Sequence, residues 1–362
     1  MNLLNRKIKV LIVDDSAIVR KILSEAVSSE PDMEVVGTAP DPYVARDKIL
    51  ALQPDVLTLD IEMPRMDGLT FLKRLMRHHP LPTIIISSLG QASCAATLEA
   101  LRCGAVDVLA KPAGPYSVGD LRQSLAGKIR GAAGSRPRIA SEVPTAPVEK
   151  PLAKAIVSAR RYPFPFDTVI AIGASTGGTV AIQDILLRLS ADMPGIVITQ
   201  HIPAGFSRAF ANRLDKICAM QVKEAENGDL VRPGLALVAP GDYHMLLRRT
   251  PAGYVIELQQ GPQVCYQRPS VDVMFASVAQ VAGAHAIGVL LTGMGADGAR
   301  GMLALKRANA LTIAQDEQSC VVYGMPREAV RLDAVRTVAS LNDMPKVLVE
   351  AVQQMSRVAQ TV

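Results

Sequence analysis

The chain has 362 residues, enough for two domains, and its 49% hydrophobic and 20% charged residues exclude a chain that is disordered throughout. No long apolar run follows the first residues, so we expect neither a signal peptide nor insertion into a membrane, and we expect a cytoplasmic location. Five cysteines without a C-x-x-C pair fit reduced thiols, and a net charge of +5 is mild.

The first third of the chain alternates short apolar runs with helical patterns. Helices are predicted at, for example, 17–27 and 95–103, and strands at 10–13, 35–37, 56–59, 84–87 and 106–109. Nearly continuous apolar strands separated by helices predict a parallel sheet that is covered on both faces. We expect this (βα)5 domain to occupy residues 1–130.

Residues 131–165 have a different composition, in which Pro, Ala, Ser, Arg and Lys dominate. Six prolines interrupt any regular helix there, so the segment is predicted to be a flexible linker.

A second alternation of strands and helices fills residues 166–362. Its strands are predicted at 169–172, 196–199, 235–238, 287–291 and 311–314, and its helices at 180–189, 206–217, 271–281, 301–307 and 345–355. A hairpin is predicted from residues 244–249 and 254–259. We expect a doubly wound, mostly parallel α/β domain.

Polar side chains stand at the ends of four of the five strands predicted for the first domain. Asp14 and Asp15 end the first strand, Asp60 the third and Ser87 the fourth, and Lys111 follows the fifth. A single aspartate there could merely cap a helix. Three carboxylates that meet at one sheet edge repel each other unless a cation intervenes, and oxygen ligands suit Mg²⁺. The set therefore predicts a phosphate switch.

Four motifs carry a resemblance to the response-regulator receiver family: V-D-D-S (13–16), D-I-E-M-P-R-M-D-G-L (60–69), I-I-I-S-S (84–88) and G-A-V-D-V-L-A-K-P (104–112). The resemblance implies a flavodoxin-like fold in which Asp60 accepts a phosphoryl group. It also implies that Ser87 and Lys111 form the switch pair. The Mg²⁺ site is implied to consist of Asp14, Asp15, Asp60 and the backbone carbonyl of Glu62.

Two details of this region modify the expectation. Val108 stands where many receivers have an aromatic switch residue, so an aromatic rotamer switch is not expected here. The bond between Lys111 and Pro112 is a candidate cis peptide.

Three residues of the second domain follow buried strands at glycine-rich or polar turns. Ser175 lies in I-G-A-S-T-G-G, His201 follows I-V-I-T-Q, and Asp297 lies in G-M-G-A-D-G. A nucleophile, a base and a carboxylate at neighbouring strand ends predict a serine hydrolase. Taken singly, each has another explanation: a phosphate-binding turn, a structural histidine or a helix cap.

Five motifs of this domain closely resemble the catalytic domain of the CheB chemotaxis methylesterases: G-A-S-T-G-G (173–178), Q-H-I (200–202), A-P-G-D-Y-H (239–244), R-P-S-V-D (268–272) and L-T-G-M-G-A-D-G (291–298). The resemblance implies that Ser175 is the nucleophile, His201 the base and Asp297 the orienting acid. Thr176 and Met294 stand where the family stabilises the oxyanion.

The resemblance also implies a substrate and partners. Members hydrolyse glutamate γ-methyl esters on methyl-accepting chemotaxis receptors, and many deamidate receptor glutamines. Their receiver takes its phosphoryl group from the chemotaxis histidine kinase, and it blocks the catalytic site until it is phosphorylated. We expect no cofactor for the esterase reaction, no nucleic-acid partner and a monomer.

Two other functions remain open at this point. The second domain could be a binding module without catalysis, or a nucleotide-binding enzyme that uses the 173–178 turn with Asp192 as the ribose ligand. DNA binding is disfavoured, because no helix-turn-helix pattern with a basic recognition helix follows the linker.

Overall fold

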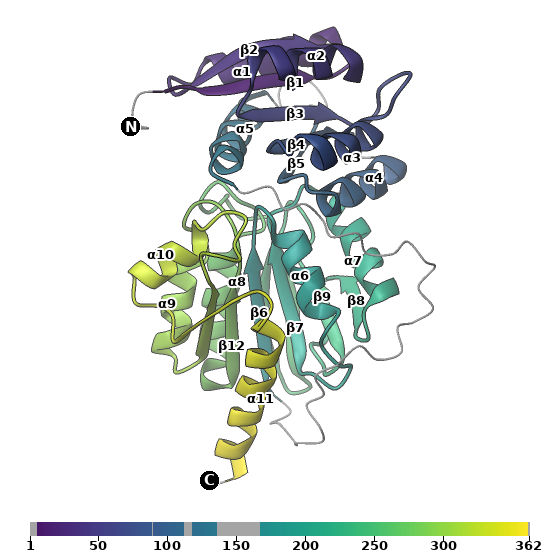
Figure 1. Ribbon diagram of the computed structural model, residues 1–362. Coiled ribbons are helices and arrows are strands. Elements are labelled where there is room, and N and C mark those ends of the chain that lie inside the picture. The colour runs from purple at the N-terminus through teal and green to yellow at the C-terminus, as the bar shows by residue number, and fades with distance from the viewer. Residues whose placement is uncertain (1–5, 89, 112–117, 136–166, 361–362) are drawn as a thin grey trace. The chain divides into compact units, whose positions relative to one another are not determined.

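The fold is described by a computed structural model over residues 6–88, 90–111, 118–135 and 167–360 (Figure 1). The chain divides into two compact units, residues 1–144 and 145–362. Pro112 and residues 136–165 of the predicted linker lie outside the described residues, and with them the candidate cis peptide.

The first unit is the predicted (βα)5 domain. Its strands are β1 (Ile8–Val13), β2 (Met33–Ala39), β3 (Val56–Asp60), β4 (Thr83–Ser87) and β5 (Asp107–Ala110). Its helices are α1 (Ala17–Ser28), α2 (Pro42–Leu52), α3 (Gly68–His78), α4 (Gln91–Arg102) and α5 (Val118–Ala133). Helix α5 therefore runs three residues beyond the predicted end of the domain.

The described strands of this unit form one parallel sheet in the order β2-β1-β3-β4-β5. The direction of strand addition reverses after β2, so right-handed crossovers place α1 and α2 on opposite faces. The carboxyl ends of β1 and β3 flank the switch point, where such sheets bind ligands. A Cβ at Gly68 would lie 1.9 Å from the carbonyl oxygen of Asp60, so only glycine lets α3 begin this close to β3.

The second unit is the predicted doubly wound domain. Its strands are β6 (Val169–Ala174), β7 (Gly195–Gln200), β8 (Gln221–Glu224), β9 (Leu235–Val238), β10 (His244–Thr250), β11 (Gly253–Gln259), β12 (Ala286–Leu290), β13 (Leu311–Gln315) and β14 (Thr337–Ala339). Its α-helices are α6 (Gly178–Leu186), α7 (Phe206–Ile217), α8 (Val271–Val281), α9 (Ala299–Arg307), α10 (Met325–Arg331) and α11 (Met344–Gln360).

The described part of this unit contains one parallel sheet in the order β14-β13-β12-β6-β7-β9-β8 and the separate hairpin β10-β11. Strand addition runs from β6 toward β8 in one half and from β12 toward β14 in the other, so the switch point lies at β6 and β12. The edge strands β8 and β14 were not predicted, because Q-V-K-E and T-V-A are too short for a clear pattern.

Helices α8 and α9 pack against each other, and α8 also contacts the hairpin and β6 (Figure 1). The core on this side contains Val271 and Phe275 of α8, both fully buried. A Cβ at Gly173 of β6 would lie 2.2 Å from Val271 Cγ1, so this glycine allows α8 to approach the strand closely. The close approach brings the beginning of α8 to the carboxyl edge of the sheet.

Candidate phosphorylation and catalytic sites

The predicted acidic cluster of the first unit is present. Asp14 and Asp60 are fully buried, Asp15 is exposed, and carboxylate oxygens of the three lie within 4.8 Å of one another. The ammonium of Lys111 lies 2.8 Å from Asp60 Oδ2 and 3.3 Å from Asp14 Oδ2. The strand ends therefore bring together four of the residues that the sequence selected.

Burial raises the pKa of Asp60 to about 6, with Lys111 lowering it and the charge of Asp14 raising it further. Burial raises the pKa of Asp14 as well, although Lys111 opposes this. Apart from the ammonium of Lys111, the Oδ2 atoms of both aspartates have no hydrogen-bond partner among the described residues. Two buried carboxylates that share one ammonium and lie beside a third carboxylate fit a small divalent cation that prefers oxygen ligands.

The hydroxyl of Ser87 is bound to the neighbouring helix. Thr97 of α4 donates a hydrogen bond of 2.9 Å to Ser87 Oγ, and both side chains are buried. Val108, in the position of the usual aromatic residue, is also buried. The Glu62 carboxylate accepts hydrogen bonds from the hydroxyls of Ser88 and Ser93, so it is tied to the segment that leads into α4.

In the second unit, backbone hydrogen bonds connect the three strand ends that carry the predicted triad. Ser175 N–H donates to the Thr292 carbonyl at 3.0 Å, and His201 N–H donates to the Ala174 carbonyl at 3.1 Å. Ser175 follows β6, His201 follows β7, and Asp297 lies in the loop after β12. The three residues therefore meet at the switch point of the sheet.

The Asp297 carboxylate receives four hydrogen bonds. His201 Nε2 lies 2.7 Å from Oδ2, which also accepts from Val271 N–H at 2.7 Å. The hydroxyl of Ser270 and the N–H of Asp272 donate to Oδ1 at 2.8 and 3.0 Å. Burial raises the pKa of Asp297, but these contacts, led by His201, outweigh burial and lower it overall. The carboxylate is thus held in its charged form at the beginning of α8.

The contact between Ser175 and His201 is less complete than the sequence predicted. No hydrogen bond joins the Ser175 hydroxyl to the imidazole in the described region, and His201 Nδ1 is buried without a hydrogen-bond partner there. The predicted hydrogen-bonded group is therefore formed only between His201 and Asp297. Such contacts are often loose in enzymes without substrate and tighten when substrate binds.

Known proteins share both halves of this arrangement. The sequence profile of the response regulator receiver domain matches residues 10–123, and that of CheB methylesterase matches residues 170–348. A protein-glutamate methylesterase/protein-glutamine glutaminase of Syntrophus aciditrophicus is 56% identical over 96% of this chain and 99% of its own length. This chain belongs to the CheB methylesterase family.

Further relatives agree. A protein-glutamate methylesterase/protein-glutamine glutaminase of Chromohalobacter salexigens is 52% identical over 98% of each chain. The crystal structure of the CheB methylesterase catalytic domain of Thermotoga maritima superposes with a TM-score of 0.50 and 35% identity, covering 51% of this chain and 97% of that domain. The doubly wound second unit thus has the fold of a CheB catalytic domain.

The two remaining residues selected by the CheB resemblance lie close to Ser175. Thr176 is buried, and its carbonyl accepts a hydrogen bond of 3.0 Å from the hydroxyl of Thr292. Met294 is half-buried in the glycine-rich loop after β12. A Cβ at Gly293 in that loop would lie 2.7 Å from Ser175 Cβ, so glycine is needed for the loop to pass Ser175.

Sequence reasoning did not select two residues that contact the triad. The side-chain amide of Gln200 donates to the Ser175 carbonyl at 2.8 Å, and Ser270 donates to Asp297. Both belong to quoted motifs, Q-H-I and R-P-S-V-D, but a motif does not tell which partner a side chain will meet. Asp192 precedes β7, at the opposite end of the strands from the 173–178 turn, which contradicts its predicted role as a ribose ligand.

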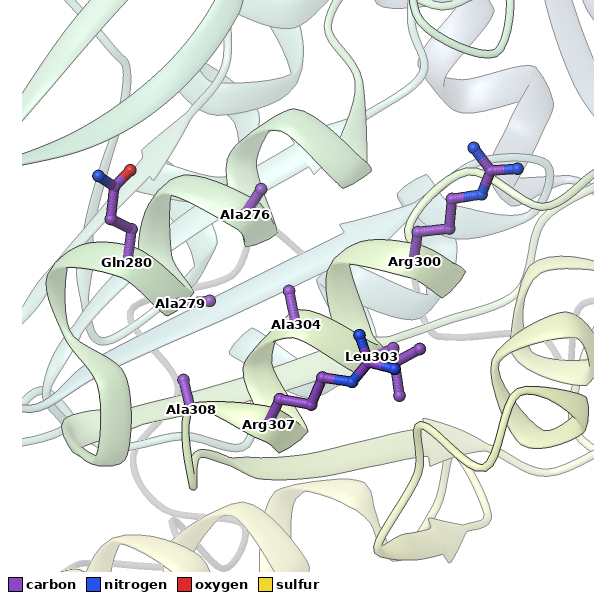
Figure 2. Close-up of a pocket in the computed structure, with 8 residues that line it drawn as sticks. All are labelled: Ala276, Ala279, Gln280, Arg300, Leu303, Ala304, Arg307 and Ala308. Atoms are coloured by element: carbon purple, nitrogen blue, oxygen red, sulfur yellow. The ribbon is translucent and has the colours of Figure 1, made fainter.

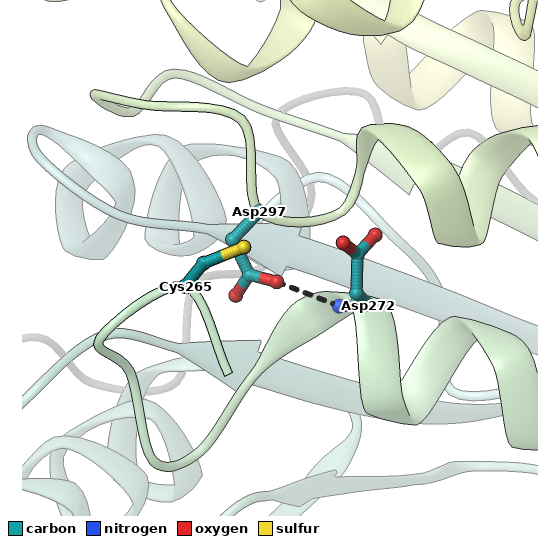
Figure 3. Close-up of side chains that lie close together, drawn as sticks. All are labelled: Cys265, Asp272 and Asp297. Atoms are coloured by element: carbon teal, nitrogen blue, oxygen red, sulfur yellow. Dashed lines mark hydrogen bonds between the residues drawn. The ribbon is translucent and has the colours of Figure 1, made fainter. Parts of the chain in front are cut away.

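A thiol lies beside the Asp297 carboxylate in this CheB domain. Cys265 Sγ and carboxylate oxygens of Asp272 and Asp297 lie within 4.8 Å of one another (Figure 3). Burial, followed by the two negative charges, raises the pKa of Cys265. The group therefore stays a thiol at neutral pH and is a poor nucleophile.

A shallow groove of about 700 Å³ lies between α8 and α9 (Figure 2). It is lined by four alanines and Leu303, together with Gln280, Arg300 and Arg307. None of the predicted catalytic residues lines it, so it is separate from the triad.

Among the described residues, no helix has the length and apolar character needed to cross a membrane.

Proposed function

We propose that this CheB-family chain hydrolyses glutamate γ-methyl esters on chemoreceptors, and deamidates receptor glutamines, under control of phosphorylation at Asp60. The observation that carries the proposal is the buried His201–Asp297 pair beside Ser175 at the switch point of the second sheet. The names of the relatives, protein-glutamate methylesterase/protein-glutamine glutaminase, agree with this chemistry.

Ester hydrolysis follows from the roles of the three residues. Ser175 Oγ attacks the ester carbonyl while His201 takes the hydroxyl proton at Nδ1, the ring nitrogen that Asp297 does not bind. Asp297 keeps the Nε2–H tautomer and stabilises the imidazolium. His201 then protonates the leaving methanol. Water attacks the acyl-enzyme in the second half and releases the glutamate side chain, with Ser175 restored.

The tetrahedral oxyanion needs donors at the turn after β6. Helix α6 begins at Gly178, directly after this turn, so its dipole favours negative charge at Ser175. We assign oxyanion stabilisation to the segment of Thr176 and to the loop of Met294. Attack on a glutamine amide uses the same groups, and the leaving group is ammonia instead of methanol.

Control is assigned to the first unit, with the chemotaxis histidine kinase as the phosphodonor. Asp14, Asp15 and Asp60, with the backbone carbonyl of Glu62, would hold Mg²⁺, which supplies positive charge to the carboxylates and to an incoming phosphoryl group. The Asp60 carboxylate attacks the phosphorus of the kinase phosphohistidine, the P–N bond breaks, and the histidine leaves. Ser87 and Lys111 bind the phosphoryl oxygens. The burial of Asp14 and Asp60 and their contacts with Lys111 support these roles.

The test measures methanol released from methyl-labelled chemoreceptors, with and without a small-molecule phosphodonor and Mg²⁺. We expect release that increases with the phosphodonor and that Ser175→Ala abolishes. Release that is unaffected by Ser175→Ala would favour the alternative of a non-catalytic second domain with a contaminating esterase in the assay.

A further inference from the structure

Two of the motifs of the second unit, residues 239–244 and 268–272, contain none of the triad residues, yet they lie together beside it. The guanidinium of Arg268 donates to the Asp242 carboxylate at 2.9 Å, and Asp242 N–H donates to the Arg268 carbonyl at 3.1 Å. The first segment leads into the hairpin β10-β11, and the second leads into α8. The hairpin is thereby tied to the beginning of the helix that holds Asp297.

Ser270 makes the connection to the catalytic carboxylate. It is fully buried, and its hydroxyl donates to Asp297 Oδ1 at 2.8 Å. The oxygen of this hydroxyl, Ser270 Oγ, also accepts a hydrogen bond from Val273 N–H at 3.4 Å, so Ser270 is the N-cap of α8. Because the hydroxyl proton is directed to Asp297, the cap and the carboxylate are oriented by one side chain.

His244, the first residue of β10, holds the backbone of Ser270. Ser270 N–H donates to His244 Nδ1 at 3.2 Å, and His244 Nε2 lies 2.9 Å from the Pro262 carbonyl oxygen. A backbone N–H can only donate and a carbonyl can only accept, so Nδ1 must be unprotonated and Nε2 must carry the proton. The two contacts fix one neutral tautomer of His244 and one ring orientation.

We propose that His244 and Ser270 are positioning residues for ester hydrolysis: together they fix the first turn of α8, whose donors hold Asp297 against His201. The inference rests on the proposed function of the triad. Both side chains are at least nine-tenths buried, so they act through Asp297 and not on the substrate. A displacement of about 1 Å at a catalytic group can cost up to about 100-fold in rate, which sets the scale of the expected effect.

Two substitutions at His244 separate positioning from general packing. The amide oxygen of Asn lies near the place of Nδ1, so His244→Asn keeps an acceptor for Ser270 N–H. The amide of Gln reaches the place of Nε2, so His244→Gln keeps the contact with Pro262 and leaves Ser270 N–H unpaired. We expect His244→Asn to keep most of the wild-type kcat and His244→Gln to lose up to about 100-fold, both with unchanged KM.

Ser270→Ala supplies a second readout. With one donor removed, the Asp297 carboxylate attracts the imidazolium of His201 more strongly, so the acid limb of the kcat/KM profile should move to higher pH while kcat falls. The other titratable groups beside Asp297 in the described part of the chain are Asp272 of α8 and Cys265 of the preceding loop. Both also interact with Arg300 of α9, and the variant retains all three residues.

Ser277→Ala is the matched control. Ser277 lies on the same helix, is buried, and accepts from Leu247 N–H of β10 at 2.9 Å, so its loss also loosens α8 from the hairpin. Its hydroxyl donates to the Met274 carbonyl and not to Asp297. We expect Ser277→Ala to lower the melting temperature without changing kcat or the acid limb.

All variants are assayed in the phosphorylated full chain by methanol release, with melting temperatures as the test of folding. The proposal is overturned if His244→Gln and Ser270→Ala retain wild-type kcat and pH profile while Ser175→Ala is inactive, an outcome that leaves the proposed function intact. It is equally overturned if Ser277→Ala or His244→Asn reproduces the losses. A wild-type chain that releases no methanol refutes the proposed function itself, and the inference with it.

Discussion

His201 and Asp297 form a buried pair in which Nε2 of the imidazole lies 2.7 Å from Oδ2 of the carboxylate. Nδ1 is consequently the ring nitrogen that would exchange a proton with Ser175 in the proposed reaction. The orientation of the ring, and not only the identity of the three residues, decides which atom would act as the base.

Substitution of the triad should abolish hydrolysis without unfolding the protein. Ser175→Ala and His201→Ala should each lower kcat by about 10⁴-fold or more, because triad members act as a unit. Asp297→Asn should cost somewhat less, since Asp297 orients the base and does not react. Methanol release from methyl-labelled receptors measures the effect. Variants of Ser175 and His201 that keep a tenth of the wild-type rate would contradict the assignment.

Phosphorylation should occur on Asp60 and require Mg²⁺, because the buried carboxylates repel each other without a cation. Label transferred from a phosphodonor should be lost on treatment with hydroxylamine, which cleaves acyl phosphates. Asp60→Asn should not be labelled, whereas Asp47→Asn, at an exposed aspartate on α2, should be labelled normally. Undiminished labelling of Asp60→Asn would identify another acceptor.

The raised pKa of Asp60 makes the stability of the protein depend on pH when Mg²⁺ is absent. The folded-state pKa of about 6 exceeds the unfolded value of 3.8, mainly because of burial. Between these values the folded state binds more protons, so the free energy of unfolding falls as pH rises and levels off above pH 6. The fall is at most about 3 kcal/mol.

Unfolding in urea from pH 4 to 8, without Mg²⁺, measures this effect as the difference between wild type and Asp60→Asn. We expect the free energy of unfolding of the variant to rise relative to that of the wild type as the pH increases from 4 to about 6. We also expect Mg²⁺ to restore stability to the wild type at pH 7.5. A difference that does not vary with pH would mean that Asp60 is ionised throughout.

The first unit should inhibit the second until Asp60 is phosphorylated. A tethered domain acts at high effective concentration, so even weak binding closes a site, and a shift of a few kcal/mol changes activity by about one to three decades. A fragment that begins at Pro163 should therefore be more active than the unphosphorylated full chain and insensitive to phosphodonor. Equal activities would indicate instead that phosphorylation acts by recruiting the enzyme to its receptor.

Gly173→Ala should destabilise the second unit, because the new Cβ would meet Val271 Cγ1 at 2.2 Å. Overpacking of this kind costs about 1–3 kcal/mol, and it would also displace the turn of α8 that holds Asp297. Gly261→Ala is the control, since its nearest neighbour would be His244 Cδ2 at 3.6 Å, an ordinary contact. Urea denaturation and methanol release should both distinguish the two variants, and equal stability would refute the packing argument.

The fold class and the residues at the sheet edges could be predicted from local patterns in the sequence. Ser175, His201 and Asp60 directly follow or end buried apolar runs, and the period of such runs predicts parallel strands whatever their order. Helices α7 and α8 were predicted with their observed bounds, because their apolar faces and the Ser270 cap are local signals. The motifs were then enough to recognise the resemblance to the response-regulator receivers and to the CheB methylesterases.

Which side chains meet depends on the packing of the whole domain. The order β12-β6-β7 brings Asp297 to His201 across 96 residues of chain, and the packing of α8 against β6 brings Ser270 and Val271 to the same carboxylate. Asp192 precedes β7, which runs parallel to β6, so it lies at the end of the sheet opposite the 173–178 turn, and the nucleotide hypothesis is wrong on this point. Contacts between residues far apart in the chain depend on strand order and helix packing, which arise from the burial of the whole core and leave no local pattern in the sequence.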